Sequence, residues 1–383
     1  MDKKGNFIII SNIEWGFLKQ RHQFLAEKLA EKGNNVIFVE SSAKRNPTLN
    51  DLPRIFLRLE KLISRRINYG KQLNGYGQIN PDITKVKVIT PIVFPSTFKI
   101  FRFFNKVFFI KFLVKQIKNQ IDHNHPIHII TYLPSSTSLQ IISSFDARTV
   151  IYDCVSNFEA VIGMPRDTSK IEKYLVKNAD VVLTDCDFLF EKHVSEAKRI
   201  KLLEPGVDFE LFKELHVFSK NKKIKNICYY GLISDKIDFS LLDDLANNGL
   251  NLFMIGPMKK GIRLPTYINY IPAVKVDELP ERLKEFDALI IPYIKNEFMK
   301  GVIPAKFFEC LATGLPVIVT KLKNYERYNS FLITGDSNEE IVDAVKNFDL
   351  TKDRLNCAKE RIKIAKKHSW DNFISEFFDE IKY

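Results

Sequence analysis

The sequence predicts an α/β protein built from two doubly wound domains, each with a parallel sheet. Short apolar runs alternate with amphipathic stretches along most of the 383 residues, the pattern of parallel strands joined by crossover helices. The alternation restarts after EPGVD at 204–208, where proline and glycine interrupt the periodicity. A chain of this length with 45% hydrophobic residues favours two cores over one.

The first half opens with a strand, a helix and a second strand. FIII at 7–10 is followed by an amphipathic helix at 17–31, a stop at Gly33 and the strand NVIFVE at 35–40. Further apolar strands are expected at 86–89, 127–133, 149–152 and 181–184.

The second half repeats this arrangement. Strands are expected at 226–231, 251–257, 268–271, 288–293 and 316–320, with helices up to 245, at 279–285 and from 304 onward. The last stretch, 354–383, reads as one or two helices.

Charge and cysteine content narrow the class of protein. A formal charge of +12 and a pI of about 9.2 favour anionic partners such as nucleotide phosphates, anionic lipids or nucleic acid. The five cysteines are scattered and contain no CxxC, which argues against a disulfide framework or a zinc site and fits a reducing cytosol. No apolar run is long enough for a signal peptide or a membrane span.

The segment PAKFFECLATGLPVIVT at 304–320 carries the chemistry. Pro304 is expected to begin a helix, in whose first turn Lys306 provides a cation for a phosphate. Glu309 lies one turn further on the same face and suits a sugar diol. Because a strand precedes this helix, its start is expected at the carboxyl edge of the sheet, where α/β proteins bind ligands. An ordinary surface salt bridge is the alternative explanation for the Lys–Glu spacing.

This segment resembles the donor-site signature of GT-B glycosyltransferases, in particular the family 4 type of bacterial capsule, O-antigen and teichuronic acid synthesis. Other segments along nearly the whole chain resemble the same family. They are SNIEWGFLKQRHQFLAEKLAEKGNNVIFVE, VIYDCVSNF, KNADVVLTDCDFLFEK, PGVDFELF, YYGLISDKIDFSLLDDLA, IPAVKVDELPERLKEFDALIIPY and HSWDNF.

The resemblance implies a fold with two Rossmann-like domains that face each other across a cleft. Residues 1–204 would form an acceptor domain, completed by a C-terminal helix at about 369–383, and residues 205–368 a nucleotide-sugar donor domain. The donor residues that it implies are Gly231, Lys236, Val274, Ile303, Ala305, Lys306 and Glu309. The acceptor residues that it implies are Trp15, Arg21 and His22.

Two departures from the family pattern affect the chemistry. Gly301 stands where many family 4 enzymes have a second glutamate, and Glu297 is the nearest acid. Ser156 and Asn157 replace the paired acids of the YDCxDDF segment. A catalytic base would have to reach the acceptor oxygen, and the candidates are acids that follow the strands of the first domain: Asp153 first, because it ends a strand, then Glu14, with Glu159 and Asp185 behind them.

Metal ligands and a basic helix are the remaining candidate features. DCD at 185–187 is better explained as a helix cap than as a metal motif, and HNHPIH at 123–128 lacks a partner cluster, so no metal is expected. The stretch 98–121 places Phe98, Phe101, Val107, Phe108, Phe112 and Ile117 on one apolar face flanked by lysines. It is expected to be either a core helix or a helix that docks on an anionic membrane.

The sequence thus favours a metal-independent hexosyltransferase without a cofactor. It would use a UDP- or GDP-type sugar and a glycan or lipid-linked acceptor, in the cytoplasm or at the inner face of the membrane. The alternatives are a GT-B epimerase, a non-catalytic nucleotide- or glycan-binding protein, an oxidoreductase and a nucleic-acid-binding protein. The first loop, SNIEWG, lacks the G-x-G-x-x-G of dinucleotide-binding oxidoreductases, and no nucleic-acid-binding module is present.

Overall fold

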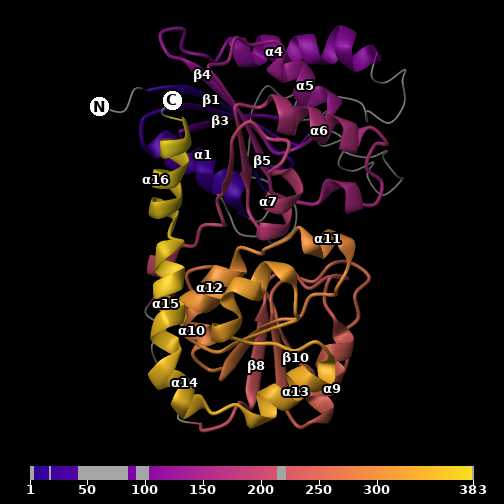
Figure 1. Cartoon of the computed structure of the whole chain (residues 1–383), viewed down its shortest axis with the longest axis vertical. Coiled ribbons are helices and arrows are strands. Elements are labelled where there is room, and N and C mark those ends of the chain that lie inside the picture. Colours follow the sequence, from indigo (N-terminus) through magenta and orange to yellow (C-terminus); the bar gives the residue numbers. More distant parts are fainter. Residues whose placement is uncertain (1–3, 17–18, 42–84, 92–102, 214–220, 382–383) are drawn as a thin grey trace. The chain divides into compact units, whose positions relative to one another are not determined.

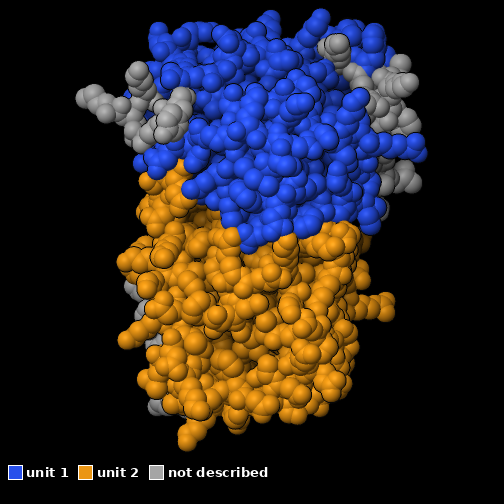
Figure 2. All heavy atoms as spheres, in the orientation of Figure 1, with its two compact units in different colours: residues 1–203, 377–383 blue, residues 204–376 orange. Residues whose placement is uncertain are grey.

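The computed structural model describes residues 4–16, 19–41, 85–91, 103–213 and 221–381. The chain divides into two compact units, residues 1–203 with 377–383 and residues 204–376 (Figure 2). The first division falls one residue before the predicted one. The chain returns to unit 1 at Phe377, within the last helix, whereas the sequence predicted a return at about 369.

Unit 1 contains a parallel sheet in the order β3-β2-β1-β4-β5-β6-β7 (Figure 1). Its strands are β1 (Asn6–Ile10), β2 (Asn35–Val39), β3 (Val86–Ile89), β4 (Ile127–Thr131), β5 (Thr149–Cys154), β6 (Val181–Thr184) and β7 (Ile200–Leu202). The order reverses between β1 and β4, which pair in register from Asn6 with Ile127 to Ile10 with Thr131. The central strands are apolar and buried because helices cover both faces of a doubly wound sheet.

Helices of unit 1 pack on this sheet and bury its apolar faces. They are α1 (Arg21–Glu31), the π-helix η2 (Asn105–Phe109), α4 (Ile110–Lys118), α5 (Ser136–Ile142), the 3-10 helix η3 (Phe158–Ala160), α6 (Thr168–Asn178) and α7 (Asp187–His193). The helices α4 and α5 lie beside each other, and Leu113, Ile117 and Ile141 share one core with the strand residues Ile8 and Ile37 (Figure 1).

Unit 2 contains a parallel sheet in the order β10-β9-β8-β11-β12-β13. Its strands are β8 (Asn226–Tyr230), β9 (Asn251–Ile255), β10 (Ile268–Ile271), β11 (Ala288–Ile291), β12 (Val317–Val319) and β13 (Leu332–Ile333). Its order reverses between β8 and β11. Ligands of open parallel sheets bind at such a point, outside the carboxyl ends of the strands.

The helices of unit 2 complete the second core and fix the donor-signature segment. They are α8 (Phe209–Phe212), α9 (Phe239–Asn247), α10 (Leu279–Leu283), α11 (Glu297–Lys300), α12 (Lys306–Ala312), the 3-10 helix η4 (Lys323–Phe331), α13 (Asn338–Asn347), α14 (Leu350–Asn356) and α15 (Ala358–Lys367). The last helix, α16 (Trp370–Ile381), belongs to unit 2 up to Glu376 and to unit 1 from Phe377 onward. Figure 1 shows α9 beside α13 and α12 beside α15, and both pairs are in contact. None of the described helices has the length and apolarity that crossing a bilayer requires.

Candidate functional site

The helix α12 brings the two signature residues to the reversal point of the unit 2 sheet. It begins at Lys306, with Ala305 as its N-cap, so Pro304 precedes the helix instead of opening it as predicted. Its apolar side is buried through Phe307, Phe308 and Leu311. Lys306 and Glu309 lie half-buried on the remaining face.

The ammonium of Lys306 lies against the end of β8. Its Nζ donates to the backbone oxygen of Tyr230 at 2.6 Å and to the hydroxyl of Tyr229 at 3.0 Å. It also lies 4.1 Å from the centroid of the Tyr229 ring. Burial acts to lower the pKa of Lys306, but the neighbouring Tyr229 and Tyr293 outweigh it and the pKa lies above its ordinary value. Lys306 therefore carries a positive charge at neutral pH, as a phosphate-binding residue requires.

Glu309 is held by the next residue of the same strand. The Tyr230 hydroxyl donates to Glu309 Oε2 at 3.1 Å. Burial raises the pKa of Glu309, while Tyr230 and Lys306 oppose the shift. The lysine and the glutamate thus do not form the surface salt bridge that their spacing alone allowed, because each has a tyrosine as its described partner.

Two glycines allow close approaches beside this lysine, Gly231 to Lys306 itself and Gly256 to the backbone of Gly231. Gly231 follows β8 with a φ of 112°, and a Cβ there would lie 2.5 Å from Lys306 Nζ. Gly256 follows β9 with a φ of 140°, and its Cβ would lie 2.3 Å from the Gly231 oxygen. Both positions therefore need glycine. Sequence reasoning found Gly231 and missed Gly256, although NLFMIGP also ends a strand on glycine.

The other predicted donor residues differ in their exposure to solvent. The exposed Lys236 places its ammonium 4.5 Å from the ring centroid of Phe298 on α11. Val274 is half-buried in the loop after β10, and the side chain of Ile303 is buried. The exposed Glu297 pairs with Lys300 at 2.5 Å, so the acid nearest to Gly301 already has a basic partner.

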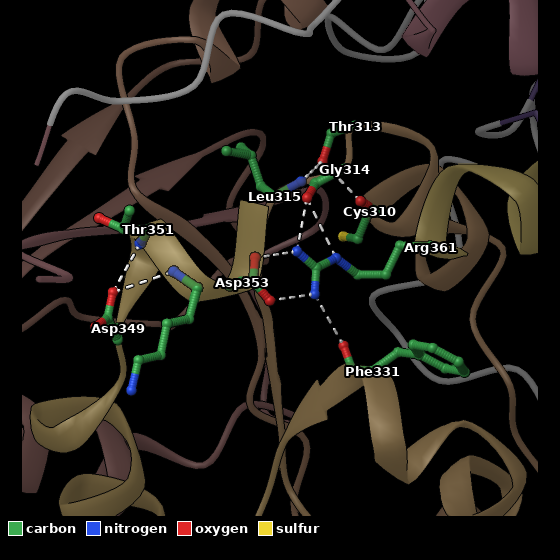
Figure 3. Close-up of polar contacts among 10 residues, drawn as sticks. Cys310, Thr313, Gly314, Leu315, Phe331, Asp349, Thr351, Asp353 and Arg361 are labelled. Atoms are coloured by element: carbon green, nitrogen blue, oxygen red, sulfur yellow. Dashed lines mark hydrogen bonds and ion pairs between the residues drawn. The ribbon is translucent and has the colours of Figure 1, made fainter. Parts of the chain in front are cut away.

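The end of α12 is anchored by a buried arginine that the sequence did not single out (Figure 3). Arg361 of α15 donates twice to the Gly314 oxygen, at 2.7 and 3.2 Å, and once to the Phe331 oxygen at 3.4 Å. It also forms a buried ion pair with Asp353 of α14, with one contact at 2.8 Å. The helix that carries Lys306 and Glu309 is thereby fixed to α14 and α15.

In unit 1, the predicted base Asp153 is fully buried at the end of β5. Its two carboxylate oxygens accept from Arg21 at 2.8 and 2.9 Å, and Arg21 also donates to the Leu203 oxygen at 2.5 Å. A carboxylate bound in this way holds an arginine in place and is poorly arranged to take a proton from an acceptor. Glu14, the second candidate, is half-buried in the loop after β1.

The three predicted acceptor residues lie in the interior of unit 1, which corrects the expectation that they are open to an acceptor. Trp15 is 1% exposed, with its ring edge-on to Phe38. His22 is 2% exposed, lies 3.1 Å from the Ser11 hydroxyl and packs on Tyr132. Together with the buried Arg21, they shape this edge of the sheet from within.

Asp185, ranked lower from the sequence, has the less satisfied carboxyl group. It follows β6 and is 5% exposed, and its Oδ1 has no hydrogen-bond partner among the described residues. Burial is the main reason that its pKa rises to about 7; Arg21 opposes the shift and Asp153 adds to it. Asp185 does not cap a helix as expected, because Cys186 is the N-cap of α7.

Within the described part of the chain, Cys154, Glu172 and His193 form the one group with metal-ligand geometry. Glu172 already accepts from the Tyr152 hydroxyl at 2.8 Å and from Lys192 Nζ at 3.0 Å. The carboxylate is therefore satisfied by protein groups. The histidines of 123–128 do not converge, since His125 faces Asp122 while His128 stacks on Phe7.

The basic aromatic stretch is divided between the core and the surface. Residues 98–102 lie outside the described residues. The predicted single face is wrong for the rest, because Ile117 lies in the core while Phe108 and Phe112 are 59% and 53% exposed. Phe103 and Phe104 are exposed as well, and together these four side chains are called the Phe patch.

Comparison with known proteins supports the two-domain architecture. No family model matches the chain. It is 27% identical over 223 residues to a protein of Bacillus subtilis (strain 168) named as a teichuronic acid biosynthesis glycosyltransferase, TuaH. That match covers 49% of this chain and about half, 54%, of the relative.

Solved structures match over almost the whole chain at low identity. Sucrose-phosphate synthase from Thermosynechococcus elongatus matches with a TM-score of 0.67 at 13% identity, over 98% of both chains. Anabaena Alr3699/HepE in complex with UDP gives 0.65 at 13%, again over 98% of both. An E. coli protein bound with UDP-2-fluoro glucose gives 0.62 at 10%, over 99% of both. The chain therefore has the GT-B fold, the two-domain fold of glycosyltransferases.

Proposed function

We propose that this protein is a glycosyltransferase that moves a hexose from a nucleotide diphosphate sugar to a glycan or lipid-linked acceptor in bacterial surface polysaccharide synthesis. One observation carries the proposal: α12 presents Lys306 and Glu309 beside Gly231 at the reversal point of the unit 2 sheet. The curated relative named for teichuronic acid synthesis supports the polysaccharide class.

Each residue of this site has a role in binding the donor. The charged Lys306 would pair with the diphosphate and stabilise the negative charge that develops as the sugar leaves. Glu309 would accept hydrogen bonds from the ribose hydroxyls. Gly231 keeps the space above the ammonium open. A positive side chain at this place performs the task that a divalent cation performs in other transferases, so we propose that transfer needs no metal.

We propose UDP as the nucleotide. The structures of Anabaena Alr3699/HepE, with UDP and with UDP-glucose, and of the E. coli protein with UDP-2-fluoro glucose show GT-B chains holding this nucleotide. GDP is the alternative, and a direct comparison of the two nucleotides decides between them.

The test measures nucleotide affinity by calorimetry, with EDTA present throughout. Lys306→Ala and Glu309→Gln are each expected to weaken UDP binding about 10- to 100-fold, because each removes a charge-assisted hydrogen bond. Lys300→Ala and Glu297→Gln are matched controls, since this exposed pair lies on the neighbouring helix α11. Unchanged UDP affinity in both site variants would overturn the site assignment.

A second candidate function follows from Gly301 and the pairing of Glu297 with Lys300, which leave the usual second acid missing. A GT-B protein of this kind could epimerise or only bind the nucleotide sugar. Incubation of UDP-glucose without acceptor separates these cases. An epimerase releases a new UDP-sugar, whereas a pure binding protein returns the donor unchanged even when a glycan acceptor is added.

We also propose that the Phe patch docks unit 1 on an anionic membrane at its cytoplasmic face, where a lipid-linked acceptor would be presented. Four exposed phenylalanines lie on η2, α4 and the residues just before them, beside the exposed Lys111, Lys115 and Lys118. Aromatic rings that enter the head-group layer and lysines that meet anionic lipids act together in such surfaces.

Sedimentation with vesicles tests this docking. The protein is expected to pellet with phosphatidylglycerol-rich vesicles at low salt and to stay in solution with phosphatidylcholine. Phe108→Ser/Phe112→Ser should reduce pelleting several-fold. Tyr174→Ser, a change at an exposed aromatic residue on α6, is the control. Equal pelleting of the double variant and the wild type would contradict the proposal.

A further inference from the structure

The described contacts of Lys306 leave part of its hydrogen-bonding capacity unused. A lysine ammonium has three N–H donors. Two of them go to the Tyr230 oxygen and the Tyr229 hydroxyl, and no third partner is present among the described residues. The direction of the remaining N–H is fixed by the other two, so the residues that hold them decide where a phosphate is bound.

Tyr229 is built to accept from this lysine. It is 1% exposed, and its own hydroxyl proton is directed to the Leu232 oxygen at 2.8 Å. Its lone pairs are therefore turned to Lys306 Nζ at 3.0 Å. Burial keeps the pKa of Tyr229 above its ordinary value, so the hydroxyl retains the proton that this arrangement needs.

Tyr230 performs the corresponding task for Glu309. Neighbouring residues of a strand point to opposite faces of the sheet, and Tyr229 lies in the core with Ile227 and Leu241 while Tyr230 lies toward α12. The Tyr230 hydroxyl donates to one oxygen of Glu309 at 3.1 Å. The other carboxylate oxygen has no partner among the described residues and is left for a ligand.

We propose that Tyr229 positions Lys306 and Tyr230 positions Glu309, so that two adjacent tyrosines tune recognition of the diphosphate and of the ribose separately. This inference rests on the proposed function, in which Lys306 binds the diphosphate and Glu309 the ribose. Neither tyrosine need touch the nucleotide, and both are positioning residues.

Ratios of affinities test the division. The affinity of UDP relative to UMP reports the terminal phosphate, and that of UDP relative to 2′-deoxy-UDP reports the ribose hydroxyl. Tyr229→Phe is expected to shrink the first ratio about 3- to 10-fold and leave the second unchanged, because one hydrogen bond to a charged group is lost. Tyr230→Phe is expected to do the reverse.

Tyr325→Phe is the matched control. Tyr325 is a buried tyrosine that stacks on Phe307 of α12, and its hydroxyl has no hydrogen-bond partner among the described residues. It should change neither ratio. If Tyr229→Phe and Tyr230→Phe lower both ratios equally, the tyrosines act only as packing and the proposal is overturned.

The outcome also separates this inference from the proposed function. A wild-type protein that binds no nucleotide refutes the donor site itself. Wild-type binding of UDP with ratios that neither variant changes refutes only the roles of the two tyrosines.

Discussion

Replacement of Arg361 by methionine should destabilise unit 2 strongly. The change keeps much of the side-chain volume but removes every polar contact of the guanidinium. Asp353, 6% exposed, would be left without its described cationic partner, and the oxygens of Gly314 and Phe331 would lose their arginine donors. Breaking a buried ion pair from one side costs about 3–5 kcal/mol. At about 2–4 °C per kcal/mol for a domain of this size, the melting temperature should fall by about 6–20 °C.

The two tryptophans allow this effect to be assigned to one unit. Trp15 belongs to unit 1 and Trp370 to unit 2. In a Trp15→Phe background, fluorescence during urea unfolding therefore reports unit 2. Lys363→Met is the control, because Lys363 is 65% exposed on the same helix and pairs with Glu360 in solvent; the expected loss is below about 1 kcal/mol.

A double-mutant cycle checks the physical reasoning. Arg361→Met/Asp353→Leu removes both charges and should be more stable than Arg361→Met alone, since no unpaired buried carboxylate remains. A loss below about 1 kcal/mol in the single variant would show that Asp353 is not left as an uncompensated buried charge. Strict additivity in the cycle would show that the pair is not coupled. The first result refutes the anchoring role of Arg361, and the second refutes its coupling to Asp353.

Three further predictions concern single positions. Gly231→Ala should abolish UDP binding, because its Cβ would lie against the ammonium of Lys306; calorimetry measures this effect. The cost in stability should be modest, about 1–3 kcal/mol by urea unfolding, because the Cβ meets the end of a side chain and not the backbone. Gly256→Ala should destabilise unit 2 more than Gly231→Ala does in the same unfolding assay, because the added Cβ meets the backbone of Gly231. A smaller loss of stability for Gly256→Ala than for Gly231→Ala would contradict this close approach. The pKa of Asp185 in the folded state is about 7, well above the ordinary pKa of an aspartate. The native state therefore holds an extra proton between these two pKa values, and its stability falls as the pH rises through that window. Asp185→Asn should remove this pH dependence of stability and stabilise unit 1 by on the order of 2–4 kcal/mol at pH 8. The fluorescence of Trp15 in a Trp370→Phe background measures the stability of unit 1. A variant with the same pH profile as the parent would refute the raised pKa of Asp185.

The sequence predicted the strands whose own residues form a nearly continuous apolar run. FIII and NVIFVE are buried on both faces of a parallel sheet, so their apolar runs are nearly continuous. β7 and β13 were missed because they are short edge strands, with the sequences IKL and LI. An edge strand of this kind is defined by its neighbour more than by its own composition.

Donor-site residues that lie close together in the sequence could be predicted, whereas their partners from distant parts of the chain could not. Lys306 and Glu309 lie three positions apart on one helix, and their spacing is visible in the sequence. The tyrosines that hold them lie 77 and 79 positions earlier, and Arg361 reaches Gly314 across 47 residues. No short pattern marks such partners, because only the packing of the folded sheet brings them together.

Unit 1 shows why sequence resemblance alone placed the acceptor residues less well. Arg21 and Asp153 stand 132 residues apart, and each satisfies the other in the interior. A binding site needs polar groups whose hydrogen-bonding capacity is not used up within the protein. The described contacts of Lys306 and Glu309 leave such capacity for a ligand. The carboxylate of Asp153, in contrast, has both oxygens bound to Arg21. Among the acids that the sequence proposed for unit 1, Asp185 has a described buried oxygen without a partner. Asp185, at the carboxyl end of β6, has hydrogen-bonding capacity left, but at 5% exposure it is as buried as Arg21 and His22 and lies, like them, in the interior of unit 1.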